Sequence, residues 1–387
     1  MRSSEMEKYR FVLYRGGTSK ALFFMENELP SEPRKRDRLL LEIYGSPDPR
    51  QINGLGGSDP TTSKVALIGP PSVEGADVDY TFGQVSLEAA SIDWTTNCGN
   101  ISSAVGPFVI DEGMVRAQEP MCRVRIHNTN TRKILTAHVP IKDGHAAVEG
   151  DYVCPGVPGT GAMISMDFSQ TAGSATGHLL PTGRPIDVLD AEDLGPVEVS
   201  LVDAGNLYVF VRAADVGATG AEDRLEINAD RSLLDRLERI RAAAAVLLGF
   251  ASSDNKATEE SPLRPAPIFV SEPRDYVNYI NGNTIARRQV SLLGRVVWNQ
   301  MGVETYTGTG SVCTLAATLI SGTVVNQLAD PEAVKSGIVR IGHPTGVMEL
   351  EGEVSITDGE PYLERAIFKR TARRLAEGYV YARIARQ

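Results

Sequence analysis

The chain has 387 residues, 42% of them hydrophobic, and a formal net charge of −10. This length predicts a substantial core and two domains, and the acidic balance argues against nucleic acid or an anionic membrane as partner. The sequence has no run of about 18 apolar residues, which a membrane-spanning helix would need. Its N-terminal stretch lacks a secretory signal, so we expect a cytoplasmic protein.

The first half predicts strands and helices in alternation. Tyr9–Phe24 is predicted as strand, glycine-rich turn and strand, and Arg34–Tyr44 as a helix ended by Gly45. Val85–Trp94 is predicted as a strand. After Asn97 the apolar residues fall at the spacing of one helical face, namely Ile101, Ala104, Val105, Phe108 and Val109.

The second half repeats this order. Val197–Val211 again predicts strand, turn and strand, and Arg231–Phe250 a helix with Asp230 as N-cap. Its apolar stripe comprises Leu233, Leu234, Leu237, Ile240, Ala244 and Leu247. Further matches link Val85 with Val290 (QVSL in both), the segment from Asn97 with that from Tyr306, and the segment from Arg123 with that from Val339. Repeats in the same order predict two similar domains, each with mostly antiparallel strands around one buried helix and with the site between them.

Cys98 is predicted at the first turn of the helix that follows NCGN. There the backbone N–H groups and the helix dipole favour an anion, a setting that lowers a thiol pKa from about 8.5 to roughly 3.5–7.5. A small buried thiol under a turn is the alternative. In the repeat, Thr307 or Thr309 stands opposite Cys98, depending on the alignment, and Cys313 is interpreted as core. A symmetrical two-cysteine racemase is therefore disfavoured.

Four short clusters of glycines and hydroxyls suit a carboxylate or phosphate ligand. The densest is Gly54–Lys64 (GLGGSDPTTSK), and the others are Gly16–Lys20, Gly159–Gly161 and His343–Gly346. The spacing of a Walker A loop is absent, so nucleotide binding is not implied. A glycine turn that leads into the strand Val65–Ile68 is the alternative for the first cluster.

The cysteines and histidines show no metal-ligand spacing. Cys98, Cys122, Cys154 and Cys313 form no CxxC pair, and the five histidines form no HExxH motif. We therefore expect no metal site, and a reducing compartment in place of a disulfide framework.

Several segments, in order, resemble the signature segments of the PrpF family. They are GGTSK at Gly16, GLGGSDPTTSK at Gly54, NCGN at Asn97, LLPTG at Leu179, DAGN at Asp203, GHPTG at Gly342 and RTARRLAEGYV at Arg370. The family contains methylaconitate and aconitate isomerases, methylitaconate Δ-isomerase and 4-oxalomesaconate tautomerase. The resemblance implies an α+β fold like that of diaminopimelate epimerase, two pseudo-repeated domains that each wrap a mostly antiparallel strand barrel around a central helix. We place the domains at 1–190 and 191–369, with 370–387 as a candidate completion of the first.

The resemblance also implies a reaction: a proton moves along an unsaturated di- or tricarboxylate, without metal or organic cofactor. Carried over by motif, the catalytic pair is Lys64 and Cys98. The second catalytic cysteine of related epimerases is replaced here by Thr307. We expect Lys64 to be the main proton-transfer residue and Cys98 a second acid or base, or a polar group that steers the enolate. The expected substrate-binding residues are Ser19, Gly57, Ser58, Thr61, Thr62, Ser63, Asn97, Gly99, Asn100, Thr307, Gly308, Thr309, Gly310 and His343.

Three other functions stay open. They are a 4-oxalomesaconate-type keto-enol tautomerase, an amino-acid epimerase, and a carboxylate-binding protein without catalysis. An epimerase needs a second acid or base, and Thr307 is a poor one. The expected partner is a small carboxylate, and a homodimer is compatible with the sequence.

Overall fold

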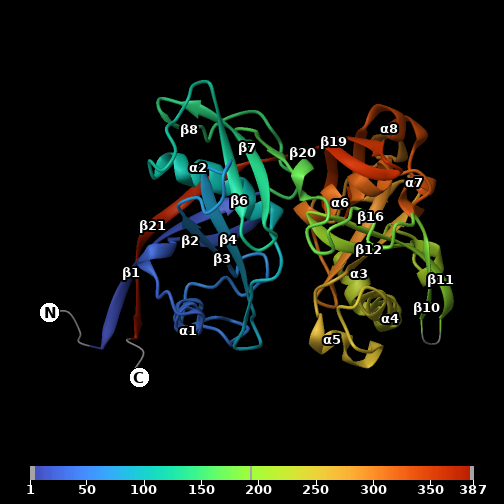
Figure 1. Ribbon diagram of the computed structural model, residues 1–387, viewed down its shortest axis with the longest axis horizontal. Helices are drawn as coiled ribbons and strands as arrows, with labels where there is room; N and C mark the ends of the chain where they lie inside the picture. Colours follow the sequence, from blue (N-terminus) through green and yellow to red (C-terminus); the bar gives the residue numbers. More distant parts are fainter. Residues whose placement is uncertain (1–4, 192–193, 384–387) are drawn as a thin grey trace. The chain divides into compact units, whose positions relative to one another are not determined.

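The computed structural model describes residues 5–191 and 194–383, and the chain divides into two compact units (Figure 1). Unit 1 runs to Met166 and resumes at Lys369, and unit 2 is Asp167–Phe368. Residues 167–190, expected in the first domain, thus lie in unit 2. Residues 384–387 of the expected completing segment lie outside the described part. Across the described residues, no helix has the length and apolar character needed to cross a membrane.

Unit 1 is built on a mixed sheet with two longer helices. Its elements are β1 (Met6–Gly16), β2 (Ser19–Met25), a 3₁₀ turn (Glu26–Glu28), α1 (Pro33–Tyr44), β3 (Lys64–Gly69), β4 (Val78–Val85), β5 (Ile92–Asp93), α2 (Gly99–Asp111), β6 (Met121–Asn128), β7 (Lys133–Lys142), β8 (His145–Ala146), β9 (Ile164–Asp167) and β21 (Ala372–Arg383). Strand β1 pairs antiparallel with both β2 and β21. Along the chain from β1, the pairs β1–β2, β2–β3, β3–β4, β4–β6 and β6–β7 alternate antiparallel and parallel.

Unit 2 has the same alternation. Its strands are β10 (Asp187–Ala191), β11 (Gly195–Ala204), β12 (Asn206–Arg212), β13 (Ala266–Ser271), β14 (Tyr276–Val277), β15 (Thr284–Ile285), β16 (Leu292–Trp298), β17 (Met301–Gly302), β18 (Ile338–His343), β19 (Gly346–Thr357) and β20 (Glu360–Arg370). Its helices are α3 (Arg224–Ala229), α4 (Arg231–Leu247), α5 (Ala257–Glu260), α6 (Gly308–Leu319), α7 (Val324–Leu328) and α8 (Pro331–Ser336), and its 3₁₀ turns are Ser169–Thr171, Ala213–Val216, Asp254–Lys256 and Arg287–Gln289. The pairs β11–β12, β12–β13, β13–β16, β16–β18 and β18–β19 run antiparallel, parallel, antiparallel, parallel, antiparallel.

One helix in each unit is buried on every side. Residues 99–110 of α2 and 308–318 of α6 are all buried. Residues 99–110 of α2 carry no charge and present apolar side chains on several faces, and the helix contacts β1, β2, β4, β6, β7, β8 and β21. In Figure 1 it lies among the strands of its own unit. Phe108 of α2 packs on Phe23 and Tyr14, with ring centroids 5.1 and 6.2 Å away.

A second helix in each unit covers the sheet with one apolar face. Leu39, Leu40 and Ile43 of α1 join the core residues of β2 and β3, and α4 does the same with β11 and β12. The Asp230 side chain accepts from the Leu233 N–H, so the expected N-cap is confirmed, and Gly45 ends α1 as expected. Leu247, expected in the apolar stripe of α4, is instead 47% exposed.

Two sequence expectations around Val85 are wrong. The strand expected at Val85–Trp94 is interrupted: β4 ends at Val85 and β5 is only Ile92–Asp93. The Ser86 hydroxyl accepts from the N–H groups of Glu88 and Ala89, and such a serine turn stops a strand. The match of Val85 with Val290 also fails, because Val85 ends β4 whereas Val290 precedes β16.

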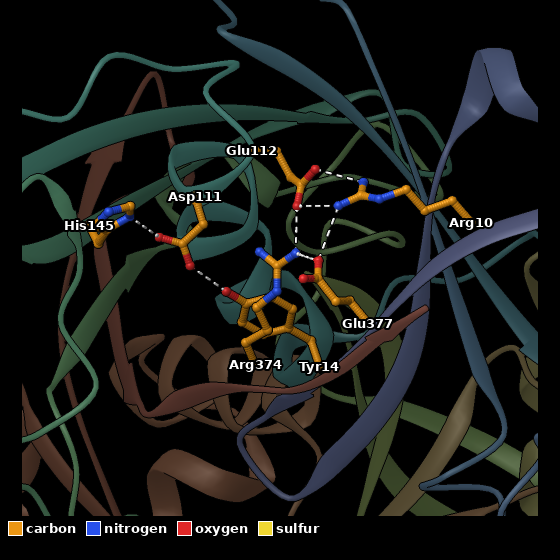
Figure 2. Close-up of polar contacts among 7 residues, drawn as sticks. All are labelled: Arg10, Tyr14, Asp111, Glu112, His145, Arg374 and Glu377. Carbon is orange, nitrogen blue, oxygen red and sulfur yellow. Dashed lines mark hydrogen bonds and ion pairs between the residues drawn. The ribbon is translucent and has the colours of Figure 1, made fainter. Parts of the chain in front are cut away.

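A charged network holds the C-terminal end of α2 (Figure 2). Glu112, the C-cap, accepts from Arg10 of β1 and from Arg374 of β21, each at 2.7 Å. Arg374 also donates to Glu377, and Asp111 accepts from the Tyr14 hydroxyl at 2.8 Å. The hydrogen bond from Arg10, together with that from Arg374, holds the Glu112 pKa below its usual range.

This network predicts a pH-dependent contribution to stability. Because the folded-state pKa of Glu112 is lowered, its stabilisation is present above the unfolded-state pKa and is lost as pH falls through the folded-state value. Glu112→Gln should lower the free energy of unfolding at pH 7 by about 1 kcal/mol. Urea titrations at pH 7 and well below about pH 4 should show this difference shrink at acid pH, and an equal difference at both would contradict the assignment.

Candidate active site

One edge of the unit 1 sheet gathers several of the expected site residues. Strands β2 and β3 run parallel, with Ala21 opposite Lys64, and β4 runs antiparallel, with Gln84 opposite Lys64. The starts of β2 and β3 and the end of β4 therefore share one edge. Gln84 also pairs with Asp93 of β5, which lies five residues before Cys98. The register thus brings the segment that carries Cys98 to the edge that carries Lys64.

Lys64 is buried at the start of β3. Its side chain is 8% exposed, and its Nζ donates to Gln84 Oε1 at 2.5 Å and lies 5.2 Å from the Phe82 ring centroid. Gln84 is oriented by its Nε2, which donates to the carbonyls of Pro60 and Ser63. Within the part of the chain that the structure describes, Lys64 makes no ion pair. One position on the buried Lys64 nitrogen faces a neutral acceptor. The other two can exchange a proton or donate to an anion.

Gln84 predicts a positioning effect on Lys64. Its Oε1 only accepts, so one Lys64 N–H must face it and the remaining positions must face elsewhere. Gln84→Met removes this acceptor at similar volume and should lower kcat by about tenfold, the scale of one hydrogen bond to a charged group, with a smaller change in KM. Thr81→Val removes the bond from Thr81 to Thr129 on the same strand and should leave kcat unchanged. Steady-state kinetics on both variants checks this, and equal kcat values would contradict it.

Cys98 is the N-cap residue of α2. It has extended backbone angles and makes no side-chain capping bond to the helix. All four cysteines lie among the described residues, and Cys98 is partly exposed while the other three are buried. The thiol therefore stands at the N-terminus of a buried helix, where the dipole favours negative charge.

Asn97 faces the core instead of the surface. It is 4% exposed, and its Oδ1 accepts from the hydroxyl of Ser102 and from the amide of Asn128. Ser102 also donates to the Cys98 carbonyl. In this structure Asn97 holds the turn that presents Cys98.

Asn100, in the first turn of α2, contacts the start of β2. Its Nδ2 donates to Thr18 Oγ1 at 3.1 Å and lies 3.5 Å from Ser19 Oγ, and both Asn100 and Ser19 are buried. Gly17 permits this approach: its φ is +49°, and a Cβ there would lie 2.4 Å from Asn100 Oδ1. This contact fixes the N-terminus of α2 at the sheet edge described above.

The hydroxyls of the glycine-rich loop are bonded within the loop and its neighbours. The buried Ser63 hydroxyl donates to Gln51 Oε1, and the exposed Ser58 hydroxyl donates to the Arg50 carbonyl. Thr61 donates to the Asp59 carboxylate and Thr62 to the Asp59 carbonyl, while Gly57 is exposed. Of the expected side-chain ligands here, only Lys64 keeps donors that are not already used on the loop and its neighbours.

Unit 2 places a hydroxyl cluster at the N-terminus of α6. Thr307 is the N-cap, and its Oγ1 accepts from the Gly310 N–H at 3.1 Å. Thr309 accepts from the Asn206 amide at 3.1 Å, and the Tyr208 hydroxyl lies 3.0 Å from both threonine oxygens. Burial raises the pKa of Tyr208 to about 12, which keeps the phenol protonated. Gly308 and Gly310 lie in the buried first turn.

Two further residues of unit 2 are fully enclosed. His343, an expected ligand, is 0% exposed, and its Nδ1 lies 3.2 Å from the Thr345 hydroxyl. Cys313 donates to the Val202 carbonyl, and burial raises its pKa well above the usual value. That burial confirms Cys313 as a core residue. Among the described residues, no group of three His, Cys, Asp or Glu side chains has the arrangement of a metal site.

Sequence reasoning missed Gln84, Gln51 and Arg370 as residues of this region. Gln84 appeared only as the first residue of the QVSL match, just before the predicted strand Val85–Trp94, and Gln51 lies ahead of the cluster that it organises. Arg370 stands in the RTARRLAEGYV segment, but its contact with Asn100 spans 270 residues. Such a separation leaves no local signal.

Comparisons with known proteins agree on one family. A family model described as "PrpF protein" matches residues 6–383. The chain is 49% identical to 3-methylitaconate isomerase of Eubacterium barkeri over 99% of each chain. It is 37% identical to 4-oxalomesaconate tautomerase of Pseudomonas putida, over 95% of this chain and 94% of the relative. It is 36% identical to 2-methyl-aconitate isomerase of Shewanella oneidensis, with the same two coverages.

Solved structures give the same result. The crystal structure of a methylitaconate-delta-isomerase matches with a TM-score of 0.83 at 49% identity, over 98% of this chain and 96% of that one. A probable proline racemase from Agrobacterium radiobacter matches with a TM-score of 0.54 at 12% identity, over 96% of this chain and 92% of that one. The second likeness concerns the fold alone.

Proposed function

The chain belongs to the PrpF family, and from that premise we propose that it moves a proton along an unsaturated di- or tricarboxylate without metal or organic cofactor. The family match confirms the resemblance of the sequence motifs. The relatives named above are isomerases or tautomerases of this acid class, and this chain is an isomerase of the PrpF type.

One observation carries the choice of site. Lys64 is buried with a single neutral partner, at the same sheet edge to which Asn100 ties the N-terminus of α2. A lysine nitrogen and a helix N-terminus both attract carboxylates. Cys98, at that N-terminus, supplies the second group that can exchange a proton. The proposed catalytic pair is therefore Lys64 and Cys98.

The reaction needs one proton removed and one returned. In methylitaconate, the carbon that carries the methyl group and a carboxylate loses its proton to the lone pair of Lys64 Nζ. The C–H electron pair spreads over the alkene and the carboxylates, and a new C–H bond forms at the terminal methylene with the proton of the Cys98 thiol. The product is a dimethylbutenedioate, and proton return from Lys64 to Cys98 through solvent resets the pair. Helix N–H groups at α2 favour the negative charge that develops.

We also propose that the two units are an internal repeat of the diaminopimelate-epimerase type. Three features support it: the identical alternation of strand pairs, the equivalent positions of Cys98 and Thr307 as N-caps, and a matched amide–hydroxyl contact behind each. That contact is reversed between units, since Asn100 of the helix donates to Ser19 of the strand, whereas Asn206 of the strand donates to Thr309 of the helix. Because the position equivalent to Cys98 holds Thr307, the repeat supplies one proton-transfer thiol and not two.

NMR in D₂O tests the function. Methylitaconate, methylaconitate, aconitate and oxalomesaconate are incubated separately with the protein, and both double-bond migration and deuterium uptake are followed. We expect migration with uptake for at least one acid, with methylitaconate as the first to test because of the 49% identical relative. Ligand-induced stabilisation without exchange would instead indicate a binding protein, and exchange at the α-carbon of an amino acid an epimerase.

A further inference from the structure

Arg370 is one of two large, fully buried arginines in the described residues. Its side chain is 2% exposed, its Nε donates to Asn100 Oδ1 at 3.0 Å, and its Nη1 donates to the Lys369 carbonyl. The other, Arg295, donates to the backbone carbonyls of Glu222 and Gly342. Arg370, unlike Arg295, thus uses a buried charge to hold a side chain at the site edge.

The direction of each hydrogen bond from Arg370 is fixed by chemistry. A guanidinium can only donate, so the Asn100 oxygen must face it and the Asn100 amide N–H₂ must face Thr18 and Ser19. Thr18 Oγ1 and Ser19 Oγ then act as acceptors toward Asn100. The Ser19 hydroxyl, which accepts from the Asn100 amide, has its own proton left to donate. A substrate carboxylate can only accept, so it binds a hydroxyl only when that hydroxyl donates its proton to it.

We propose that Arg370 is a positioning residue that acts through Asn100 to turn the Ser19 hydroxyl into a donor for a substrate carboxylate. The inference rests on the proposed function, since it takes the ligand to be a carboxylate. Arg370 keeps its positive charge in a protein, although burial lowers its pKa. The same positive charge thus favours an anion at the first turn of α2.

We call the chain of hydrogen bonds from Arg370 through Asn100 to Ser19 the relay. Substitutions of Arg370 and Asn100 test it. Arg370→Met removes the donor at similar length and should raise KM for the best acid by about tenfold to a hundredfold, the scale of one charged hydrogen bond, with a smaller effect on kcat. Arg370→Lys keeps a group that only donates and should recover most of the affinity. Asn100→Ala should raise KM to a similar degree. Because Arg370 acts through Asn100, the double variant R370M/N100A should be no worse than N100A alone.

A matched control lies at the other end of the same helix. Arg374 donates to Glu112 at the C-cap of α2 (Figure 2), so Arg374→Gln should lower the melting temperature and leave KM unchanged. Melting temperatures of all variants separate folding from binding. If R370M lowers the melting temperature but keeps KM, or if the effects of R370M and N100A add, the relay is wrong.

The binding of a saturated analogue separates this inference from the proposed function. Calorimetry with methylsuccinate measures affinity without turnover. A wild-type protein that neither converts the acids nor binds methylsuccinate would overturn the function and the relay together. A wild-type protein that converts an acid, with R370M unchanged in KM and in methylsuccinate affinity, would overturn the relay alone. Weaker binding by R370M, with R370K near wild type, supports it.

Discussion

Replacing Lys64 by glutamine is expected to lower kcat by about 10²- to 10⁴-fold, the range for loss of a positioned general acid or base. The side chain is 8% exposed and faces Gln84, so a glutamine fits the space and can still hydrogen-bond there. It cannot take up a proton, however. Solvent exchange in D₂O should fall with turnover, because proton removal from substrate is the step that is lost.

Lys64→Arg separates charge from proton transfer. The guanidinium keeps positive charge and donors for a carboxylate but cannot be deprotonated in a protein. We expect KM within a few-fold of the wild-type value together with the kcat loss of K64Q, provided that the melting temperature shows a folded variant. Lys8, whose Nζ lies 4.2 Å from the Tyr379 ring centroid, offers a control with a similar aromatic contact, and Lys8→Gln should keep full activity. Near-normal kcat in both Lys64 variants would remove Lys64 from the mechanism.

Local pattern explains what could be predicted of the fold. The i, i+3, i+4 spacing from Ile101 located α2, and the Asp230 side chain and Gly45 marked a helix start and a helix end because capping depends on neighbouring residues alone. The break after Val85 was missed because the Ser86 hydroxyl, and not the hydrophobic pattern, decides the backbone there. Leu247 belongs to the apolar stripe by spacing, yet α4 ends at that residue and the core does not extend to it.

In the candidate site, too, local pattern could predict some residues and not others. Lys64, Cys98 and Asn100 could be predicted because the motifs place them beside glycines and a helix start. Composition could not show that Ser58 and Ser63 use their hydroxyl protons on Arg50 and Gln51. Hydrogen-bond direction depends on three-dimensional neighbours. Gln84 and Arg370 reach the site from 20 and 270 residues away, and no local pattern encodes such contacts.

Replacing Cys98 distinguishes its two candidate roles. If the thiol returns the proton, Cys98→Ala and Cys98→Ser should both lower kcat by about 10²- to 10⁴-fold, because an alcohol is a far weaker acid than a thiol. If Cys98 only steers the enolate as a polar group, C98S should retain most activity while C98A loses it. Cys122, buried and with its Sγ 3.7 Å from the Arg116 carbonyl, provides the control, since Cys122→Ala should cost stability and not turnover.

The exchange reaction assigns the order of steps. With Lys64 intact, C98A should still remove the substrate proton, so deuterium should enter recovered substrate at the carbon next to the methyl group while the double bond stays in place. K64Q should show neither exchange nor migration. Deuterium uptake by K64Q but not by C98A would reverse the assignment and make Cys98 the base. Because Cys98 is the one partly exposed thiol among the four, alkylation by iodoacetamide should reproduce the C98A pattern, and bound methylsuccinate should slow it.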